Sequence, residues 1–570
     1  MLCIGEAKMY RKSQNTLGPE GAFELPFEGQ LCEDNRWIVL SKLIPWSEFE
    51  AEYAQNFSED MGAPAKSFRM ALAALIIKEK LRISDRETVE QIQENPYLQY
   101  FIGRNSYQNE APFDPSMMVH FRQRISSDML QKINRRIVQT SLGFNPEEPS
   151  TKKLEEAEKP PGNRGRLLMD ATVAPADIKY PTDVELLNQA RKTTELIIDL
   201  LYKSLKDNLD KKPRTYRKNA RKDYLNFAKK RKSSGKQRKE AVKKQLQYIK
   251  RNLGHIDKLI EQGASLELLS RRQYRNLLVS AEIYRQQDLM WSNNQKRIDN
   301  RIVSLTQPHV RPIVRGKAGS PTEFGAKLSV SCVEGYVLLE KISWESYNES
   351  GDFISQVEAY KELTGFYPES VHADKIYRTR VNRAWCKERG IRLSGPPLGR
   401  PRTQVSLQDK KQALEDERIR NEIEGKFGQG KRRFSLNRVM SKLSKTSETS
   451  INLTFLVLNL VKLLRQFYCL FLCQFFQTLI ILCRSINFSY ELKNRSKAMF
   501  IGAVRGASCS FTPPAFYNFF SKPYLDFHSD DASKELKAQW QQVLVEIGRL
   551  KQQKLQEKSR RSSSKPPKTD

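Results

Sequence analysis

The chain has 570 residues, which is too long for one ordinary hydrophobic core and predicts two or three domains with extensions. Lysine and arginine number 97 against 66 acidic residues, and the resulting formal charge of +31 calls for a polyanionic partner. Nucleic acid is the first candidate, beside ribosomal and membrane-surface partners. The eight cysteines form no Cys-x-x-Cys pair and only five histidines are present, which argues against a zinc finger or a disulfide framework.

The first 34 residues are interpreted as an N-terminal extension. The stretch from Met1 to Lys12 lacks the charged-then-apolar pattern of a signal peptide, so we expect a cytoplasmic protein.

Residues 35–144 are predicted to form a helical domain. The apolar run Met70–Ile77 indicates a buried helix, and Ser84 followed by Glu87 is typical of a capping box. A later basic run contains Arg122 and Arg124. Short helices with basic faces are typical of helix-turn-helix modules, so both arginines are candidate DNA contacts, with a plain helical bundle as the alternative.

Residues 145–165 are rich in Pro, Glu, Lys and Gly, which is typical of a linker and marks a domain boundary. A short apolar run of strand length follows at Leu167–Val173, and it carries a single acid, Asp170.

Residues 184–300 interrupt the strand pattern with long helices. One helix has the seam of a coiled coil, with apolar residues at alternating spacings of 4 and 3: Val242, Leu246, Ile249, Leu253, Ile256 and Ile260. Residues 203–251 contain 20 Lys or Arg and 4 Asp or Glu. A solvated coiled-coil face is the alternative, but phosphates would relieve the repulsion within such a segment, which favours a DNA-gripping arm. Its candidate contacts are Lys229, Lys230, Arg231 and Lys232.

Strand patterns return after the insertion. The runs Lys327–Val333 and Tyr336–Ile342 flank the turn signal Glu334-Gly335 and predict a hairpin. A helix is expected over 353–363, then a strand at Ser370–Asp374 and another at Ile391–Leu393. With the helical insertion set aside, this order predicts a ribonuclease H-like α/β domain with a mixed sheet over 166–465, beside an all-α N-terminal domain.

Three acids are the candidates for chemistry. Asp170 and Asp374 each end a short apolar strand, and adjacent strands would bring both carboxylates to one sheet edge. A carboxylate there must be solvated or bound to a cation. The third, Glu424, would share one helix face with Arg420 and Lys431, which suits a metal and the phosphates around it.

Other interpretations of these acids remain open. A salt-bridged helix without a site would show the same spacing of arginine and glutamate. Glu422 is the nearest competitor for the third acid, but Arg418 and Gln429 stand at the matching offsets. Asp177 and Asp183 compete for the first acid, and both lie in a predicted loop.

In these motifs the chain resembles the bacterial insertion-sequence transposases with an Asp-Asp-Glu triad. Their third acid lies in the signature Tyr-x2-Arg-x3-Glu-x6-Lys, of which Arg420, Glu424 and Lys431 match, whereas Glu417 stands in place of the tyrosine. Relatives often have Asp-Lys-Gly after the second strand, and here Ile376 follows Lys375. The resemblance covers about residues 35–465, including Asp170-Ala-Thr and Tyr180-Pro-Thr-Asp183-Val-Glu-Leu-Leu187.

The resemblance implies two-metal cleavage and strand transfer. Asp170, Asp374 and Glu424 would hold two Mg²⁺ ions, with Mn²⁺ as the alternative ion, and Arg420 and Lys431 would contact phosphates. The implied partners are double-stranded DNA, namely the terminal inverted repeats and the target, and a second copy of the chain in the synaptic complex. No small-molecule substrate is implied, and the expected location is the bacterial nucleoid. A magnesium-dependent nuclease without strand transfer is the alternative.

Residues 466–484 are predicted to form an apolar helix. Its run Phe467–Cys483 reaches the lower limit for crossing a bilayer, so a basic membrane-anchored protein is a further alternative, although Gln474 and Gln477 favour a buried helix. Residues 485–570 are interpreted as a C-terminal extension whose tail, 558–570, is disordered.

Overall fold

The computed structural model describes residues 24–25, 29–57, 64–143, 162–207, 209, 211–317, 320–395 and 406–469. Most of the N-terminal extension and of the linker therefore lies outside the described residues. The C-terminal extension 485–570, with its tail, and the apolar helix 466–484 beyond residue 469 also lie outside them.

The N-terminal helical region contains seven described helices. Serines begin three of them, because the side chains of Ser67, Ser84 and Ser126 each accept a hydrogen bond from a backbone N–H in the first turn. The apolar run predicted to be a buried helix is α3, whose residues from Ala71 to Ile77 are fully buried. The helices are α1 (Arg36–Leu43), α2 (Trp46–Ala54), α3 (Phe68–Leu81), α4 (Asp85–Glu94), α5 (Pro96–Phe101), α6 (Met117–Arg124) and α7 (Ser127–Ser141).

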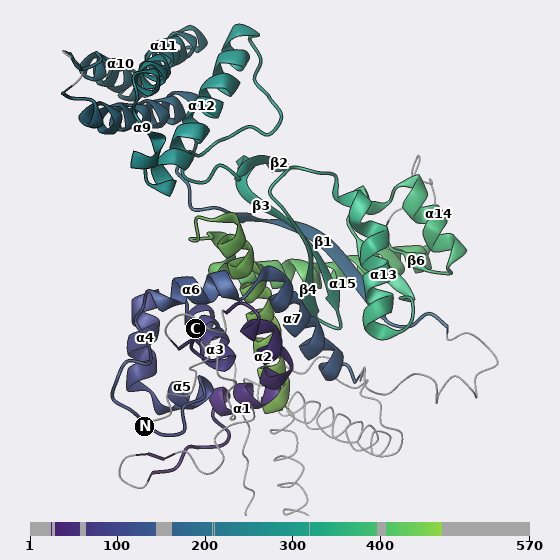
Figure 1. Ribbon diagram of the computed structural model, residues 1–570. Coiled ribbons are helices and arrows are strands. Elements are labelled where there is room, and N and C mark those ends of the chain that lie inside the picture. The colour runs from purple at the N-terminus through teal and green to yellow at the C-terminus, as the bar shows by residue number, and fades with distance from the viewer. Residues whose placement is uncertain are drawn as a thin grey trace, which may run out of the picture. The chain divides into compact units, whose positions relative to one another are not determined.

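A six-stranded mixed sheet forms the centre of the α/β region (Figure 1). Its order is β2-β3-β1-β5-β6, and β4 also pairs with β3. Strand β1 lies between β3 and β5, and it runs antiparallel to β3 and parallel to β5. The strands are β1 (Arg166–Pro175), β2 (Arg311–Lys317), β3 (Ser320–Val333), β4 (Tyr336–Ser343), β5 (Ser370–Ala373) and β6 (Arg392–Leu393). This arrangement confirms the predicted ribonuclease H-like fold class.

The β3–β4 hairpin turns at the predicted dipeptide. Glu334 and Gly335 have φ angles of 47° and 76°, and two successive positive values are what a tight two-residue hairpin turn needs. Glycine adopts such an angle without steric cost, which explains the choice of residue 335.

The two faces of the sheet are covered by different helices. On one face α13 (Phe353–Thr364) and α14 (Arg380–Glu388) pack over Leu167, Met169 and Val371. On the other, α15 (Leu407–Arg433) and a helix over residues 444–469 share a hydrophobic core with the N-terminal helices. The described residues up to 469 accordingly belong to one compact unit.

The helical insertion lies between β1 and β2 and consists of α9 (Asp183–Ser204), α10 (Arg217–Ala228), α11 (Gly235–Glu261) and α12 (Arg271–Ser292), which form a bundle in Figure 1. The predicted seam lies on α11. Its members Val242, Leu246 and Ile249 pack with Leu187 of α9, and Ile256 belongs to a second cluster. Ile260 is 37% exposed, so the seam stops packing one turn before the helix ends.

None of the helices in the described ranges is both long and apolar enough to cross a bilayer. Most of the run Phe467–Cys483 lies outside those ranges.

Candidate active site

Asp170 is a half-buried acid within a strand that is otherwise mostly buried. Side chains alternate along a strand, and Leu168 packs into the core on the α15 side, so Asp170 faces the same side. Both neighbours of Asp170, Met169 and Ala171, are buried. A carboxylate in this setting lies next to α15 at the centre of the sheet.

Asp374 lies beside Asp170. Strand β5 pairs with β1 in parallel register, in which Met169 is opposite Ala373. Asp170 directly follows Met169, and Asp374 directly follows Ala373, so the parallel pairing brings the two acids to neighbouring positions. Asp374 is exposed and its Oδ1 accepts a hydrogen bond of 2.7 Å from the Lys375 N–H, which begins the short helix η4 (Lys375–Tyr377).

Burial raises the pKa of Asp170 to about 6. The negative charges of Glu349 and Asp374 raise this pKa further, whereas Arg420 and a 2.7 Å hydrogen bond from the Ala171 N–H lower it. Neighbouring carboxylates repel each other when ionised, and a bound cation removes that repulsion.

Helix α15 is held across the sheet next to these acids. Its apolar residues Ile419, Ile423 and Phe427 are buried against the sheet. On the same helix the Arg420 guanidinium lies 3.1 Å from the Glu424 carboxylate, and about half of the Glu424 side chain is exposed. Lys431 lies in the last turn of α15.

The three predicted acids therefore do not all converge. Within the described ranges no three carboxylate, imidazole or thiol groups are close enough together to hold a metal ion. The two adjacent aspartates nevertheless fit Mg²⁺, because this ion prefers oxygen ligands and commonly uses only one or two carboxylates while keeping several waters. Glu424 pairs instead with Arg420.

Glu349 is an acid of this region that the sequence analysis missed. It lies in the short helix η3 (Glu349–Asp352), which packs against η4. The Asn382 amide joins the two by donating to the Ser350 and Tyr377 carbonyls, at 3.0 and 2.8 Å. Lys327 lies 2.8 Å from the Glu349 carboxylate, and both side chains are largely buried. No strand end or helix period singles out Glu349 in the sequence.

The predicted DNA contacts lie in two different settings. Arg122 donates to both oxygens of Asp85, at 3.0 and 2.6 Å, and its side chain is only 12% exposed. The Arg124 guanidinium lies 4.4 Å from the centre of the Phe57 ring. By contrast, the basic tip between α10 and α11 is fully accessible, with Lys229, Lys230, Arg231 and Lys232 all exposed.

Comparisons with known proteins match two parts of the chain. Residues 371–461, which include Asp374 and Glu424, match the family model "Transposase DDE domain". Residues 25–124 match the family model "Transposase domain (DUF772)". A curated Rhizobium meliloti protein named "Uncharacterized protein ORF8 in nfe locus" is 30% identical over 180 residues, covering 32% of this chain and 81% of the relative.

No solved structure matches the chain. The two family models fall on the N-terminal helices and on the segment from β5 to the helix over 444–469, in the order that the sequence motifs predict. The chain therefore belongs to the DDE transposases of bacterial insertion sequences.

Proposed function

We propose that this transposase cleaves DNA at the ends of its insertion sequence and joins those ends to target DNA, using divalent metal ions held by Asp170, Asp374 and Glu424. Transposases of this family act on DNA and generally use divalent metals. The choice of residues, the Mg²⁺ ion, with Mn²⁺ as the alternative, and the strand-transfer step belong to the proposal.

One observation carries the proposal, namely that Asp170 and Asp374 each directly follow the last paired residues, Met169 and Ala373, of two adjacent parallel strands. The raised pKa of Asp170 supports it, because an acid that is costly to ionise alone is well suited to a site where a cation compensates the charge. Asp170 lies within β1 and Asp374 directly follows β5, and such placement on the sheet favours a rigid site.

Metal ions in such a site, when bound, supply Lewis-acid activation of a water or a 3′-hydroxyl and stabilise the leaving oxygen. The chain's own residues perform the remaining work. Asp170 and Asp374 would provide two carboxylate ligands. A DNA phosphate that binds Arg420 would release Glu424 from its ion pair, and Glu424 would then provide the third carboxylate. Arg420 and Lys431, about three turns apart on α15, would orient the phosphates near the scissile bond.

The exposed basic tip of the insertion would hold DNA outside the active site through Lys229, Lys230, Arg231 and Lys232. Arg122 and Arg124 are weaker candidates for DNA contacts, since Asp85 and Phe57 already engage them. Two element ends must be joined together, so we expect two copies of the chain in the synaptic complex, acting at the nucleoid.

The test uses the purified full-length chain and duplexes taken from the inverted repeats that flank its gene. We expect Mg²⁺-dependent cleavage, and joining of pre-cut ends to a target plasmid, by the unmodified protein. Asp374→Ala and Glu424→Gln should each reduce both steps by at least about a thousandfold, whereas Glu415→Gln on the same helix should not. Cleavage that survives Asp374→Ala would refute the site. Cleavage without joining would identify a nuclease instead.

A further inference from the structure

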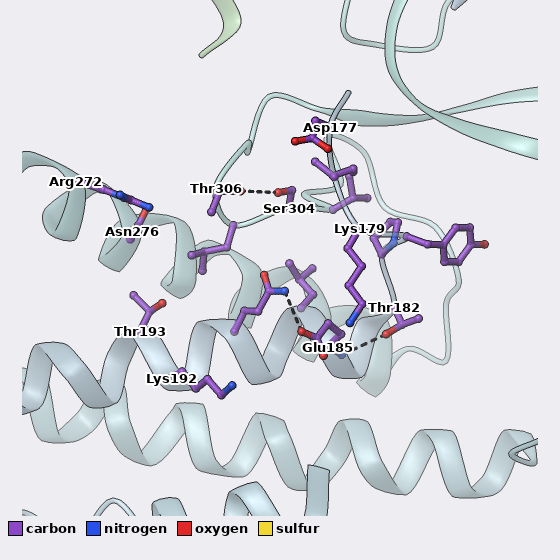
Figure 2. Close-up of a pocket in the computed structure, with 17 residues that line it drawn as sticks. Asp177, Lys179, Thr182, Glu185, Lys192, Thr193, Arg272, Asn276, Ser304 and Thr306 are labelled. Atoms are coloured by element: carbon purple, nitrogen blue, oxygen red, sulfur yellow. Dashed lines mark hydrogen bonds between the residues drawn. The ribbon is translucent and has the colours of Figure 1, made fainter. Parts of the chain in front are cut away.

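A cleft lies at the root of the helical insertion, where the chain leaves β1 and enters α9. Its volume is about 480 Å³, which is in the range of ligand-binding pockets. Four segments line it, as Figure 2 shows: the loop 177–182, helix α9, helix α12 and the loop 303–306. None of the residues proposed for catalysis lies in its lining.

Three cations surround this cleft and come from three different segments (Figure 2). Lys179 lies on the loop after β1, Lys192 on α9 and Arg272 on α12. All three side chains are exposed. Three cations around one cleft repel one another, and an anionic ligand would relieve that repulsion.

The two acids of the lining, by contrast, are already engaged. Asp177 accepts a hydrogen bond of 2.7 Å from the Arg438 guanidinium. Glu185 accepts from the Gln189 amide at 3.0 Å and from the Tyr224 hydroxyl. Arg438 neutralises the charge of Asp177, whereas the donors to Glu185 are neutral, so Glu185 offsets one of the three cations and the lining keeps a net positive charge.

One polar atom without an internal partner and one exposed ring also belong to this lining. The side-chain oxygen of Asn276 is buried and has no hydrogen-bond partner among the described residues. Tyr180 at the rim is 72% exposed, although its ring contacts Phe324 edge-to-face at 5.6 Å. Of these groups, the exposed cations suit the phosphates of a DNA backbone, and the acceptor oxygen of Asn276 suits a donor such as a bridging water.

The cleft begins directly after β1, the strand that carries Asp170. Between Asp170 and Pro175, β1 extends for five residues, which is about 17 Å at about 3.3 Å per residue. The same length of DNA axis carries about five phosphates on each strand. The 177–182 loop is fixed at this end, since Val439 pairs with Pro175 and Arg438 with Asp177.

We propose that this cleft binds backbone phosphates of double-stranded DNA about half a helical turn from the scissile bond, through Lys179, Lys192 and Arg272. The inference rests on the proposed function in taking DNA as the partner and in placing the scissile bond at Asp170. It adds a DNA-binding site at the root of the insertion, between the active site and the basic tip. The insertion and the sheet would then bind one continuous duplex.

The test measures DNA binding without catalysis. Full-length protein carrying Asp374→Ala is titrated with a 30-base-pair duplex in EDTA at several salt concentrations, with fluorescence anisotropy as the readout. Each lost phosphate contact lowers the slope of log K against log salt by about 0.9, so Lys179→Ala, Lys192→Ala and Arg272→Ala together should lower it by about 2 to 3. The matched control is Lys387→Ala, Lys410→Ala and Lys411→Ala, three exposed lysines outside the cleft. An equal slope for both triple variants would overturn the proposal.

A second variant keeps the three cations and adds a negative charge. Thr193→Glu introduces a carboxylate into the lining from α9 and should weaken duplex binding at low salt about tenfold or more, with an unchanged circular dichroism spectrum. Normal binding by Thr193→Glu would contradict the proposal even if the triple variant misfolded. A deoxynucleoside monophosphate that binds with the same dependence on the three cations, while the duplex slope stays constant, would assign the cleft to a small ligand instead. Cleavage assays are a separate measurement, so the active-site proposal and this one fail independently.

Discussion

The Asp416 carboxylate on α15 accepts two hydrogen bonds from the Arg392 guanidinium on β6, each 2.9 Å long. Burial by itself raises the pKa of Asp416, but the bonds from Arg392 and Gln412 outweigh it and hold the pKa below its ordinary value. The Nδ1 atom of His372 on β5 lies 3.6 Å from the same carboxylate. This contact fixes α15 to the sheet one turn before Arg420, so it aligns the helix with Asp170 and Asp374.

Removing the contact between Arg392 and Asp416 should therefore lower both the stability and the activity of the protein. Arg392→Ala leaves the nearly buried Asp416 carboxylate with fewer donors, and we expect a loss of about 1 to 3 kcal/mol in the free energy of unfolding. The loss should be present at neutral pH and disappear as Asp416 becomes protonated below pH 4, because the paired carboxylate has the lower pKa in the folded state. Urea denaturation at several pH values measures it. Arg418→Ala, which removes an exposed 4.0 Å pair with Glu415, should leave stability unchanged.

Asp170→Asn should stabilise the metal-free protein. The pKa of Asp170 in the folded chain is about 6, above its ordinary value of 3.8, so the folded state binds the proton more tightly than the unfolded state does. Stability should therefore fall as pH rises from about 4 to about 6, and the ionised side chain should cost up to about 3 kcal/mol at pH 7. Asparagine carries no such charge, so thermal unfolding of the variant should lose this pH dependence.

Divalent metal provides the matching measurement. Mg²⁺ should raise the unfolding temperature of the unmodified chain at pH 7, because an ion that binds only the folded state stabilises it. It should have little effect on Asp170→Asn. An equal rise in both proteins would mean that the ion binds elsewhere.

Arg420→Ala tests whether the partner of Glu424 acts in catalysis. Without the guanidinium 3.1 Å away, Glu424 is no longer held along the helix, and the proposed phosphate contact is lost. We expect strand cleavage to fall by about 10- to 100-fold, while the folded stability changes by less than about 1 kcal/mol because the pair is substantially exposed. Arg418→Ala on the same helix is the control, since that side chain is 78% exposed. Equal activities in the two variants would exclude a role for Arg420.

Two glycines allow a paired test of the fold. A Cβ atom on Gly325 of β3 would collide with the Ala174 carbonyl oxygen and lie 2.8 Å from the Pro175 Cα atom, both backbone atoms of β1. Gly325→Ala should therefore destabilise the sheet by several kcal/mol in urea denaturation. At Gly254 in α11 an added Cβ would meet nothing within 4 Å, so Gly254→Ala should stabilise the bundle by about 1 kcal/mol. A larger loss of stability for Gly254→Ala than for Gly325→Ala would contradict the β1–β3 pairing.

The sequence by itself determined the elements whose signals are local. Apolar runs of strand length marked β1 and β5, and the dipeptide Glu334-Gly335 marked the hairpin. The acids in these runs pointed to Asp170 and Asp374, although Asp170 lies in the middle of β1 and not at its end as predicted. These features are readable because backbone geometry imposes short periods and specific turn residues on the chain.

Only the tertiary structure decided what lies around those acids. Glu349 comes near Asp170 because Asn382 joins η3 to η4, and Arg122 is engaged because α4 presents Asp85 to it. The cleft at the root of the insertion likewise joins Lys179, Lys192 and Arg272 from three segments. Contacts of this kind depend on how distant elements pack against one another. Such packing produces no periodic pattern in a single sequence, so the sequence does not predict it.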